Sequence, residues 1–279
     1  RFYSMLGSLN KALEKYRFNQ AANILYEFIW HEFCDWYIEL AKPALQNKNT
    51  QIVLYKVLEK TLRCLHPFMP FITEEIWQKL RITNHESRIT SIMTQPWPHI
   101  QKQMIDRRAE RQMRLAIEVI TAIRNMRAQM NVLPAQKVNV NVIYIDKKAG
   151  KALKEVAGYI VRLARLENLN LQAAGQKAAV GLPIAQADEL KQKKGISAIV
   201  RDVRIHLELE GLLDIDKEVE RINKEISSLS ASLKAKETRL KNKDFVRKAP
   251  AEVVEKEKES LASGKEKLVQ LNRMVNELK

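Results

Sequence analysis

Apolar residues recur at three- and four-residue steps through the first half of the chain, and this spacing predicts a series of amphipathic helices. The expected helices cover residues 1–17, 20–46, 50–65, 73–80 and 101–130. The second helix carries one apolar stripe formed by Ala22, Leu25, Ile29, Phe33, Trp36 and Leu40, with further aromatic residues on its other faces. A helix that is apolar around much of its circumference should be the central, most buried member of a bundle. We therefore predict an antiparallel helical bundle over residues 1–135.

Proline residues predict where these helices are interrupted. The run HPFMPF at residues 66–71 holds two prolines, each of which lacks an N–H donor and restricts the preceding residue, so a rigid elbow is expected. Thr73 is the expected N-cap of the next helix, with Glu74 and Glu75 in its first turn. Residues 82–100 are rich in Thr, Ser, Asn and Pro and predict a loop, in which Trp97 is expected to cover the bundle.

The periodicity changes after residue 137. Residues 138–145 form a β-branched run that predicts a strand. Residues 148–166 are expected to be helical, residues 168–172 to form a short strand, and residues 196–210 to form one bent strand or two. These elements predict a small α+β module over residues 136–212.

The last part of the chain has a heptad pattern. The apolar positions of its first half are Ile215, Val219, Ile222, Ile226, Leu229, Leu233 and Leu240, and those of its second half are Val254, Leu261, Leu268, Leu271, Val275 and Leu278. Two heptad stretches separated by a break at residues 243–250 predict an antiparallel coiled-coil hairpin over residues 213–279. Gly264 is expected to weaken the seam locally. The fold class is therefore mainly α.

Composition agrees with a helical protein of a reducing compartment. The 279 residues include only 8 glycines and 8 prolines, so long helices are uninterrupted. The two cysteines, Cys34 and Cys64, lie in apolar helical patterns and are expected to be core thiols, which suits a cytoplasmic location. No apolar run reaches the roughly 18 residues of a membrane span. The first residue is Arg1, inside an expected helix, so we expect a part of a longer protein.

The formal net charge of +15 is densest over residues 81–137, which carry 10 basic and 4 acidic side chains. Six arginines share one predicted helix: Arg107, Arg108, Arg111, Arg114, Arg124 and Arg127. The guanidinium fork binds phosphate through two hydrogen bonds, so these arginines are candidate phosphate contacts. The alternative is a solvated face with local ion pairs, such as one between Arg114 and Glu118.

A second group of basic residues is expected at the turn of the hairpin: Lys241, Lys243, Arg247 and Lys248. A long basic surface suits a long polyanion, because each neutralised phosphate releases a condensed counterion. The aromatic side chains of Trp30, Trp36, Tyr37, Trp77 and Trp97 could stack on bases, but Trp36 and Trp77 lie on apolar stripes and are expected in the core.

No pattern in the sequence indicates catalysis. The five histidines are far apart, no CxxC or HExxH motif is present, and no glycine-rich phosphate loop occurs. We therefore predict no catalytic residue, no metal site and no cofactor site in this chain.

Four runs of the sequence resemble valyl-tRNA synthetases of the bacterial type, which are class I aminoacyl-tRNA synthetases. They are EFCDWYIELAKPAL at residues 32–45, LHPFMPFITEEIWQKL at 65–80, IRNMRAQMNVLP at 123–134 and KDFVRKAPAEVVEKEKESL at 243–261. The second run resembles a feature shared with the isoleucine, leucine and methionine enzymes. The first and the last resemble the valine enzyme specifically.

This resemblance implies a division of labour. The bundle would hold the anticodon stem-loop of valine tRNA, and the hairpin would lie against the outer corner of the tRNA. ATP and Mg²⁺ would bind an upstream catalytic domain, whose HIGH and KMSKS motifs do not occur in this sequence. The chain is expected to act as a monomer. Two other functions remain open from the residues alone: a structural protein that docks another protein through its coiled coil, and a general RNA binder.

Overall fold

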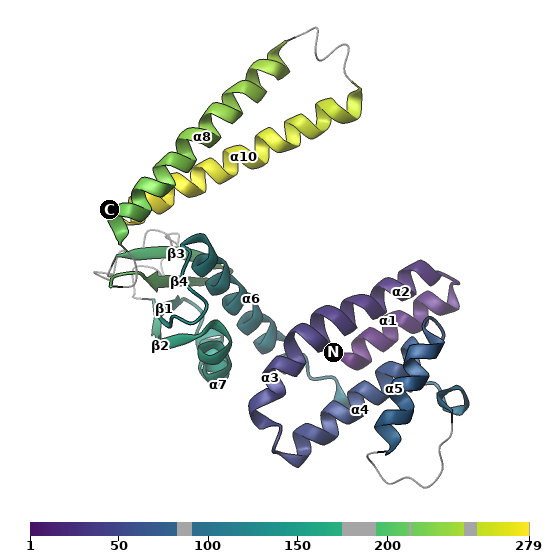
Figure 1. The fold of residues 1–279 in the computed structure, drawn as a ribbon. Coiled ribbons are helices and arrows are strands. Elements are labelled where there is room, and N and C mark those ends of the chain that lie inside the picture. Colours follow the sequence, from purple (N-terminus) through teal and green to yellow (C-terminus); the bar gives the residue numbers. More distant parts are fainter. Residues whose placement is uncertain (83–90, 175–193, 212–213, 243–249, 279) are drawn as a thin grey trace. The chain divides into compact units, whose positions relative to one another are not determined.

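A computed structural model describes residues 1–82, 91–174, 194–211, 214–242 and 250–278 (Figure 1). The chain forms two compact units, Arg1–Arg111 and Gln112–Lys279. The first is helical. The second combines a small four-stranded sheet with a pair of long antiparallel helices. The predicted fold class is confirmed: mainly α, with a helical bundle, a small α+β module and a helical hairpin. The division into domains at residues 135 and 212 stays a prediction.

The first unit consists of consecutive helices joined by short turns. They are α1 (Phe2–Glu14), α2 (Phe18–Tyr26), the π-helix η1 (Glu27–Ile38), α3 (Glu39–Ala41), the 3₁₀ turn η2 (Lys42–Ala44), α4 (Lys48–Leu65), α5 (Pro70–Ile82) and the 3₁₀ turns η3 (Ile92–Thr94) and η4 (Lys102–Met104). Helix α6 (Arg107–Gln129) begins in this unit and continues into the second.

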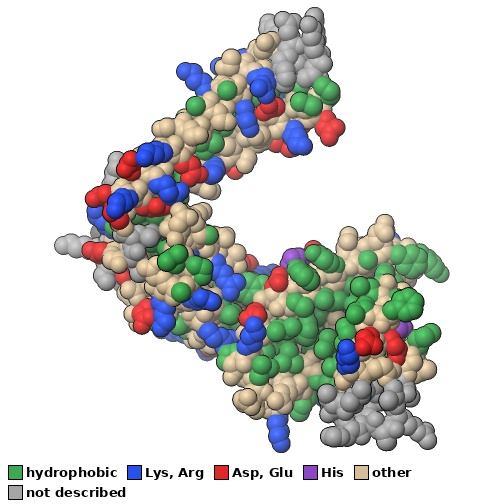
Figure 2. Space-filling view, viewed as in Figure 1, with side chains coloured by type: hydrophobic (Ala, Val, Ile, Leu, Met, Phe, Trp, Pro, Cys, Tyr) green, Lys and Arg blue, Asp and Glu red, His purple; other side chains and the backbone are tan. Residues whose placement is uncertain are grey.

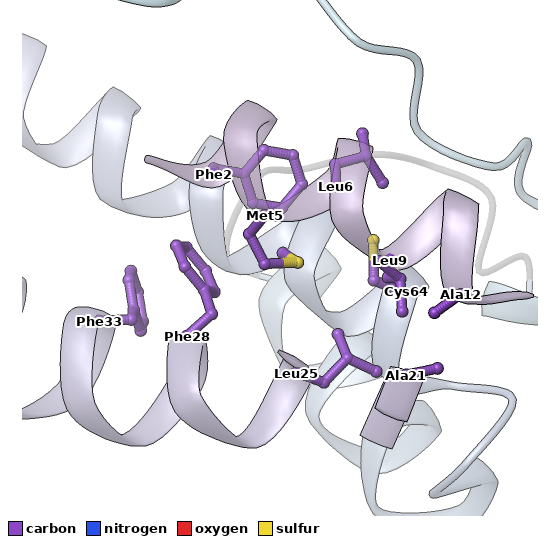
Figure 3. Packing of buried hydrophobic residues seen from close by; sticks show 10 residues of the cluster. All are labelled: Phe2, Met5, Leu6, Leu9, Ala12, Ala21, Leu25, Phe28, Phe33 and Cys64. Carbon is purple, nitrogen blue, oxygen red and sulfur yellow. The ribbon is translucent and has the colours of Figure 1, made fainter. Parts of the chain in front are cut away.

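Helix α1 supplies one side of the core of this unit. Its buried residues lie at three- and four-residue steps: Phe2, Met5, Leu6, Leu9 and Ala12. They pack with Ala21, Leu25, Phe28, Phe33 and Cys64 from the neighbouring helices (Figure 3). Cys64 and Cys34 are both free thiols, as expected. Burial raises the pKa of the Cys64 thiol to about 12, so it stays protonated at neutral pH.

The second predicted helix differs from the expectation because its middle is a π-helix. Hydrogen bonds from i to i+5 place residues five apart on one face. Phe28 and Phe33 are accordingly both buried, and their rings point toward Phe2 and Met5 (Figure 3). The predicted stripe at three- and four-residue steps is only partly buried. The expectation that this helix is the most buried one is wrong, since Tyr26 and Trp30 are each more than half exposed.

Helix α4 begins where the Asn47 side chain accepts a hydrogen bond from the Asn49 N–H at 2.8 Å. The apolar residues of this helix are only partly buried, since Leu62 lies in the core while Ile52 is 47% exposed. Trp97 covers the bundle as predicted: it packs against the core cluster, and its indole N–H donates to Asn10 at 3.0 Å.

Helix α5 begins three residues earlier than predicted. Pro70 is its first residue, a position where the missing N–H costs no hydrogen bond and the fixed φ favours a helix. Thr73 is therefore not the N-cap. Its buried hydroxyl donates instead to the Met69 carbonyl at 2.8 Å and lies 2.7 Å from Nδ1 of His66, so it holds the proline elbow in place.

The α+β module of the second unit contains a four-stranded sheet of order β2-β1-β4-β3. Its elements are β1 (Val138–Tyr144), α7 (Lys147–Ala164), β2 (Leu166–Ala173), β3 (Gly195–Val200) and β4 (Val203–Glu208). Helix α7 connects the parallel strands β1 and β2, whereas β4 runs antiparallel to both β1 and β3. The predicted segment 196–210 thus forms two strands, which turn at Arg201 and Asp202.

The arm consists of α8 (Ile215–Lys241) and α10 (Ala251–Leu278), which run antiparallel (Figure 1). Six predicted heptad residues of the arm are buried: Ile222, Leu233, Val254, Leu271, Val275 and Leu278. Helix α10 continues through Gly264, where an added Cβ would lie 2.5 Å from a methyl carbon of Leu233. The base of the arm is attached to the sheet, because the Ser197 N–H donates to the Glu277 carboxylate at 2.6 Å.

Two glycines of α7 make a matched test of the packing of the module. A Cβ on Gly150 would lie 2.1–2.5 Å from the buried ring of Tyr144, whereas a Cβ on Gly158 would meet nothing within 4 Å. We expect Gly150→Ala to destabilise the module by about 1–3 kcal/mol through overpacking. Gly158→Ala should stabilise α7 by up to about 1 kcal/mol, because alanine favours a helix. Amide hydrogen exchange of residues 147–164 should be faster in the first variant and slower in the second. Equal rates in both variants would contradict this packing.

Candidate nucleic-acid interface

Helix α6 carries the six arginines that the sequence predicts as candidate phosphate contacts. It begins at Arg107, six residues later than predicted, because the Asp106 carboxylate accepts hydrogen bonds from the backbone N–H groups of Arg108 and Ala109 at 2.8 and 3.0 Å. These backbone hydrogen bonds lower the pKa of Asp106, so its cap is charged at neutral pH. The buried residues of the helix are Leu115, Ala116, Val119, Ile120, Ile123, Met126 and Arg127.

Three of the nominated arginines belong to the first unit, and all three are exposed. Arg107 donates to the Glu110 carboxylate at 2.9 Å, so its charge is partly offset. Arg108 and Arg111 project from the same end of the helix.

The other three belong to the second unit and differ in their surroundings. Arg114 is exposed, and its expected partner Glu118 pairs instead with Arg201 at 2.5 Å. The predicted pair between Arg114 and Glu118 is therefore absent from the described residues. Arg124 is exposed but donates from Nε and Nη2 to the Leu163 carbonyl at 3.1 and 3.0 Å. Its guanidinium is thus fixed to the end of α7.

Arg127 differs from the other five candidate arginines of α6 because it is buried. Its side chain is 7% exposed, and it donates to the carbonyls of Leu133, Gln136 and Arg165 at 3.0, 2.7 and 3.3 Å. Burial, together with the nearby charge of Arg165, lowers its pKa. A guanidinium that donates to three backbone carbonyls holds the chain after α6 in place. The helical pattern did not reveal this, because these acceptors lie outside the helix.

The basic tip of the arm is only partly described. Lys241 is exposed, whereas Lys243, Arg247 and Lys248 lie outside the described residues. Along the shaft, basic residues pair with acids across the two helices: Lys267 with Glu225 at 2.9 Å, Lys265 with Glu237 at 2.5 Å and Arg239 with Glu257 at 2.9 Å. Figure 2 shows this as Lys and Arg side chains interspersed with Asp and Glu over the arm. Much of its positive charge is therefore neutralised internally.

The structure adds a group of basic residues that the sequence analysis did not nominate. Lys147, Lys151 and Lys154 line one groove at the start of α7, together with Tyr144, Glu155 and Ala173. Their spacing of four and three residues in a predicted helix was the available signal, because it places them on one face. No sequence pattern indicated that strand ends form the other side of the groove.

The described residues contain no group of three or more His, Cys, Asp or Glu side chains placed to hold a metal ion. Within the same residues, no helix is long and apolar enough to cross a membrane.

Comparison with known protein families gives two matches, in the order that the sequence predicts. Residues 1–143 match the anticodon-binding domain of tRNA ligases. The chain belongs to this family. Residues 214–279 match the tRNA-binding arm of valyl-tRNA synthetases, which is the helical hairpin of the structure.

Whole-chain relatives agree with both matches. The chain is 37% identical to the valine–tRNA ligase of Syntrophotalea carbinolica over 284 aligned residues and 37% identical to that of Thermotoga maritima over 281. It is 39% identical to the enzyme of Carboxydothermus hydrogenoformans over 268 residues, which cover 94% of the chain. The first two alignments cover the whole chain but only 30% of each relative, so the chain spans less than a third of their length. The predicted resemblance to valyl-tRNA synthetases is confirmed.

Substitution of Arg127 tests its structural role. Arg127→Gln leaves buried carbonyls without donors, and each unsatisfied buried acceptor costs about 1–3 kcal/mol. We expect a clear loss of stability in urea denaturation followed by circular dichroism. Arg114→Gln on the exposed side of the same helix should change stability by less than about 0.5 kcal/mol. Equal stability of the two variants would show that Arg127 is not a structural residue.

Proposed function

We propose that the chain is the tRNA-holding part of a valine–tRNA ligase and that its partner is valine tRNA. The observation that carries this proposal is the presence, on one chain, of an anticodon-binding domain followed by a tRNA-binding arm. In this proposal the helical bundle holds the anticodon stem-loop, and the arm lies against the outer corner of the tRNA. The protein acts as a monomer in the cytoplasm.

The chemistry of the surfaces supports this role. Phosphate contacts position a nucleic acid, whereas contacts with bases specify it. Exposed arginines on a rigid helix, such as Arg108, Arg111 and Arg114, suit the first task. The anticodon loop suits the second, because its bases are unstacked and their edges can be read, unlike those of an A-form stem. ATP, Mg²⁺ and the reacting groups would be bound by the remaining part of the ligase, and this chain would supply affinity and orientation.

The two other functions make different demands. A structural protein would dock a partner through the coiled coil and would ignore tRNA. A general RNA binder would bind all tRNAs equally. The family matches support a tRNA partner and not a protein partner. The identity to valine–tRNA ligases supports selective binding of valine tRNA and not equal binding of all tRNAs.

Salt-dependent binding separates these functions. We expect the chain to retard valine tRNA in a gel-shift titration, with an affinity that falls steeply as salt rises, because bound cations displace condensed counterions. Another tRNA should bind more weakly, and duplex DNA of equal charge more weakly still. Equal affinity for all tRNAs would indicate a general binder, whereas no retardation of any RNA at low salt would refute the proposed function.

Deletion of residues 214–279 tests the role of the arm. We expect weaker tRNA binding and an unchanged helical signal from residues 1–111, because the described cluster of buried residues in this unit contains no residue of the arm. Circular dichroism and the same titration measure both quantities. Loss of the bundle on deletion would show that the arm is a folding element, and unchanged affinity would show that it does not bind tRNA.

A further inference from the structure

The α+β module contains a groove of about 470 Å³ at one edge of its sheet. Tyr144 and Ala173 end the parallel strands β1 and β2, and both line this groove. The opposite wall is the first half of α7, which contributes Lys147, Lys151 and Lys154. These residues span about 10 Å along the helix axis, given the rise of an α-helix.

The charges of these three lysines are not offset by ion pairs. Each lysine is exposed, and none has a salt-bridge or hydrogen-bond partner for its ammonium group among the described residues. Some exposed lysines elsewhere on the chain have acidic partners, such as Lys42 with Glu39 and Lys79 with Glu75. The groove therefore holds three positive charges that form no ion pair among the described residues.

One acidic residue also lines the groove. The Glu155 carboxylate accepts a hydrogen bond from the Gln112 side chain at 2.5 Å. It can offset at most one of three positive charges, so the groove stays cationic. The wall formed by Tyr144 and Ala173 adds no carboxylate beside the ammonium groups.

We propose that this groove binds the phosphate backbone of the tRNA, as a third contact in addition to those of the bundle and of the arm. The inference rests on the proposed function and adds a surface to it. An ammonium group binds phosphate as a point charge on a flexible stem, without a fixed geometry. Three such groups on one helix follow a strand of phosphates whatever its sequence. The groove thus contributes affinity and position, and no discrimination between bases.

Replacement of the three lysines tests the inference. In the full chain, Lys147→Gln, Lys151→Gln and Lys154→Gln together remove three phosphate contacts. The slope of log affinity against log salt for a valine tRNA transcript should become less negative by about 2–3, since each contact contributes about 0.7–0.9. Affinity at 0.1 M salt should fall roughly 10- to 100-fold. The variant with Lys147→Arg, Lys151→Arg and Lys154→Arg keeps the three positive charges, so it should keep the slope of the unmodified chain.

A second triple variant provides a control of equal net charge. Lys42→Gln, Lys79→Gln and Lys137→Gln also remove three positive charges, but each of these lysines already pairs with an acid. We expect this variant to keep the original slope to within about half a unit. If both triple variants change the slope equally, net charge and not the groove determines affinity, and the inference fails while tRNA binding stands.

Lysine acetylation of the unmodified protein gives an independent readout that does not depend on how a variant folds. Saturating tRNA should protect Lys147, Lys151 and Lys154 from acetylation, measured by peptide mass spectrometry, and should leave Lys42 reactive. If the chain binds tRNA but the groove lysines are not protected, the inference about the groove is overturned and the proposed function stands. A chain that binds no tRNA would overturn the inference and the proposed function together.

Discussion

Ion pairing within the protein determines which of its 48 basic side chains can hold a polyanion. A cation that pairs with a neighbouring carboxylate must give up that contact to bind phosphate, so it adds little to affinity. Along the arm, pairs such as Lys267–Glu225 and Lys265–Glu237 join the two helices and use their charges for local structure. Exposed pairs of this kind contribute less than about 1 kcal/mol each, but they remove charge from the surface. The net charge of +15 therefore overstates how much of the surface is available to RNA.

The cations without acidic partners are supported by packed elements. Arg114 projects from a helix whose opposite face is buried, and the groove lysines project from α7, which packs on the sheet through residues such as Leu153 and Ile160. A rigid support lowers the entropy that binding must offset. The coiled-coil arm follows the same rule, because its buried seam fixes the direction of two long helices whose sequence is mostly polar. Core packing thus positions the charges that the proposed function uses.

Regular periodicity could be predicted from the sequence, whereas departures from it could not. The heptads of the arm, the strand at Val138–Tyr144 and the solvent face of α6 follow from spacing alone. The π-helix at Glu27–Ile38 does not, because its five-residue step looks like an irregular apolar run when it is read with the period of an α-helix. Phe28 and Phe33, which lie five residues apart in this π-helix, are both buried. The arginines show the same limit: spacing identified six on one helix, but only tertiary contacts distinguish buried Arg127 from exposed Arg114. The lysine groove could not be predicted from helical spacing alone, because its other wall is formed by the ends of β1 and β2.

In the proposed function, cations on separate rigid supports contact separate parts of one folded tRNA. Hydroxyl-radical footprinting of valine tRNA bound to the whole chain tests this central claim most directly. We expect at least two separate protected regions, one in the anticodon stem-loop and one at the outer corner where the D and T loops meet. Protection that is uniform along the RNA, or confined to a single region, would contradict the claim.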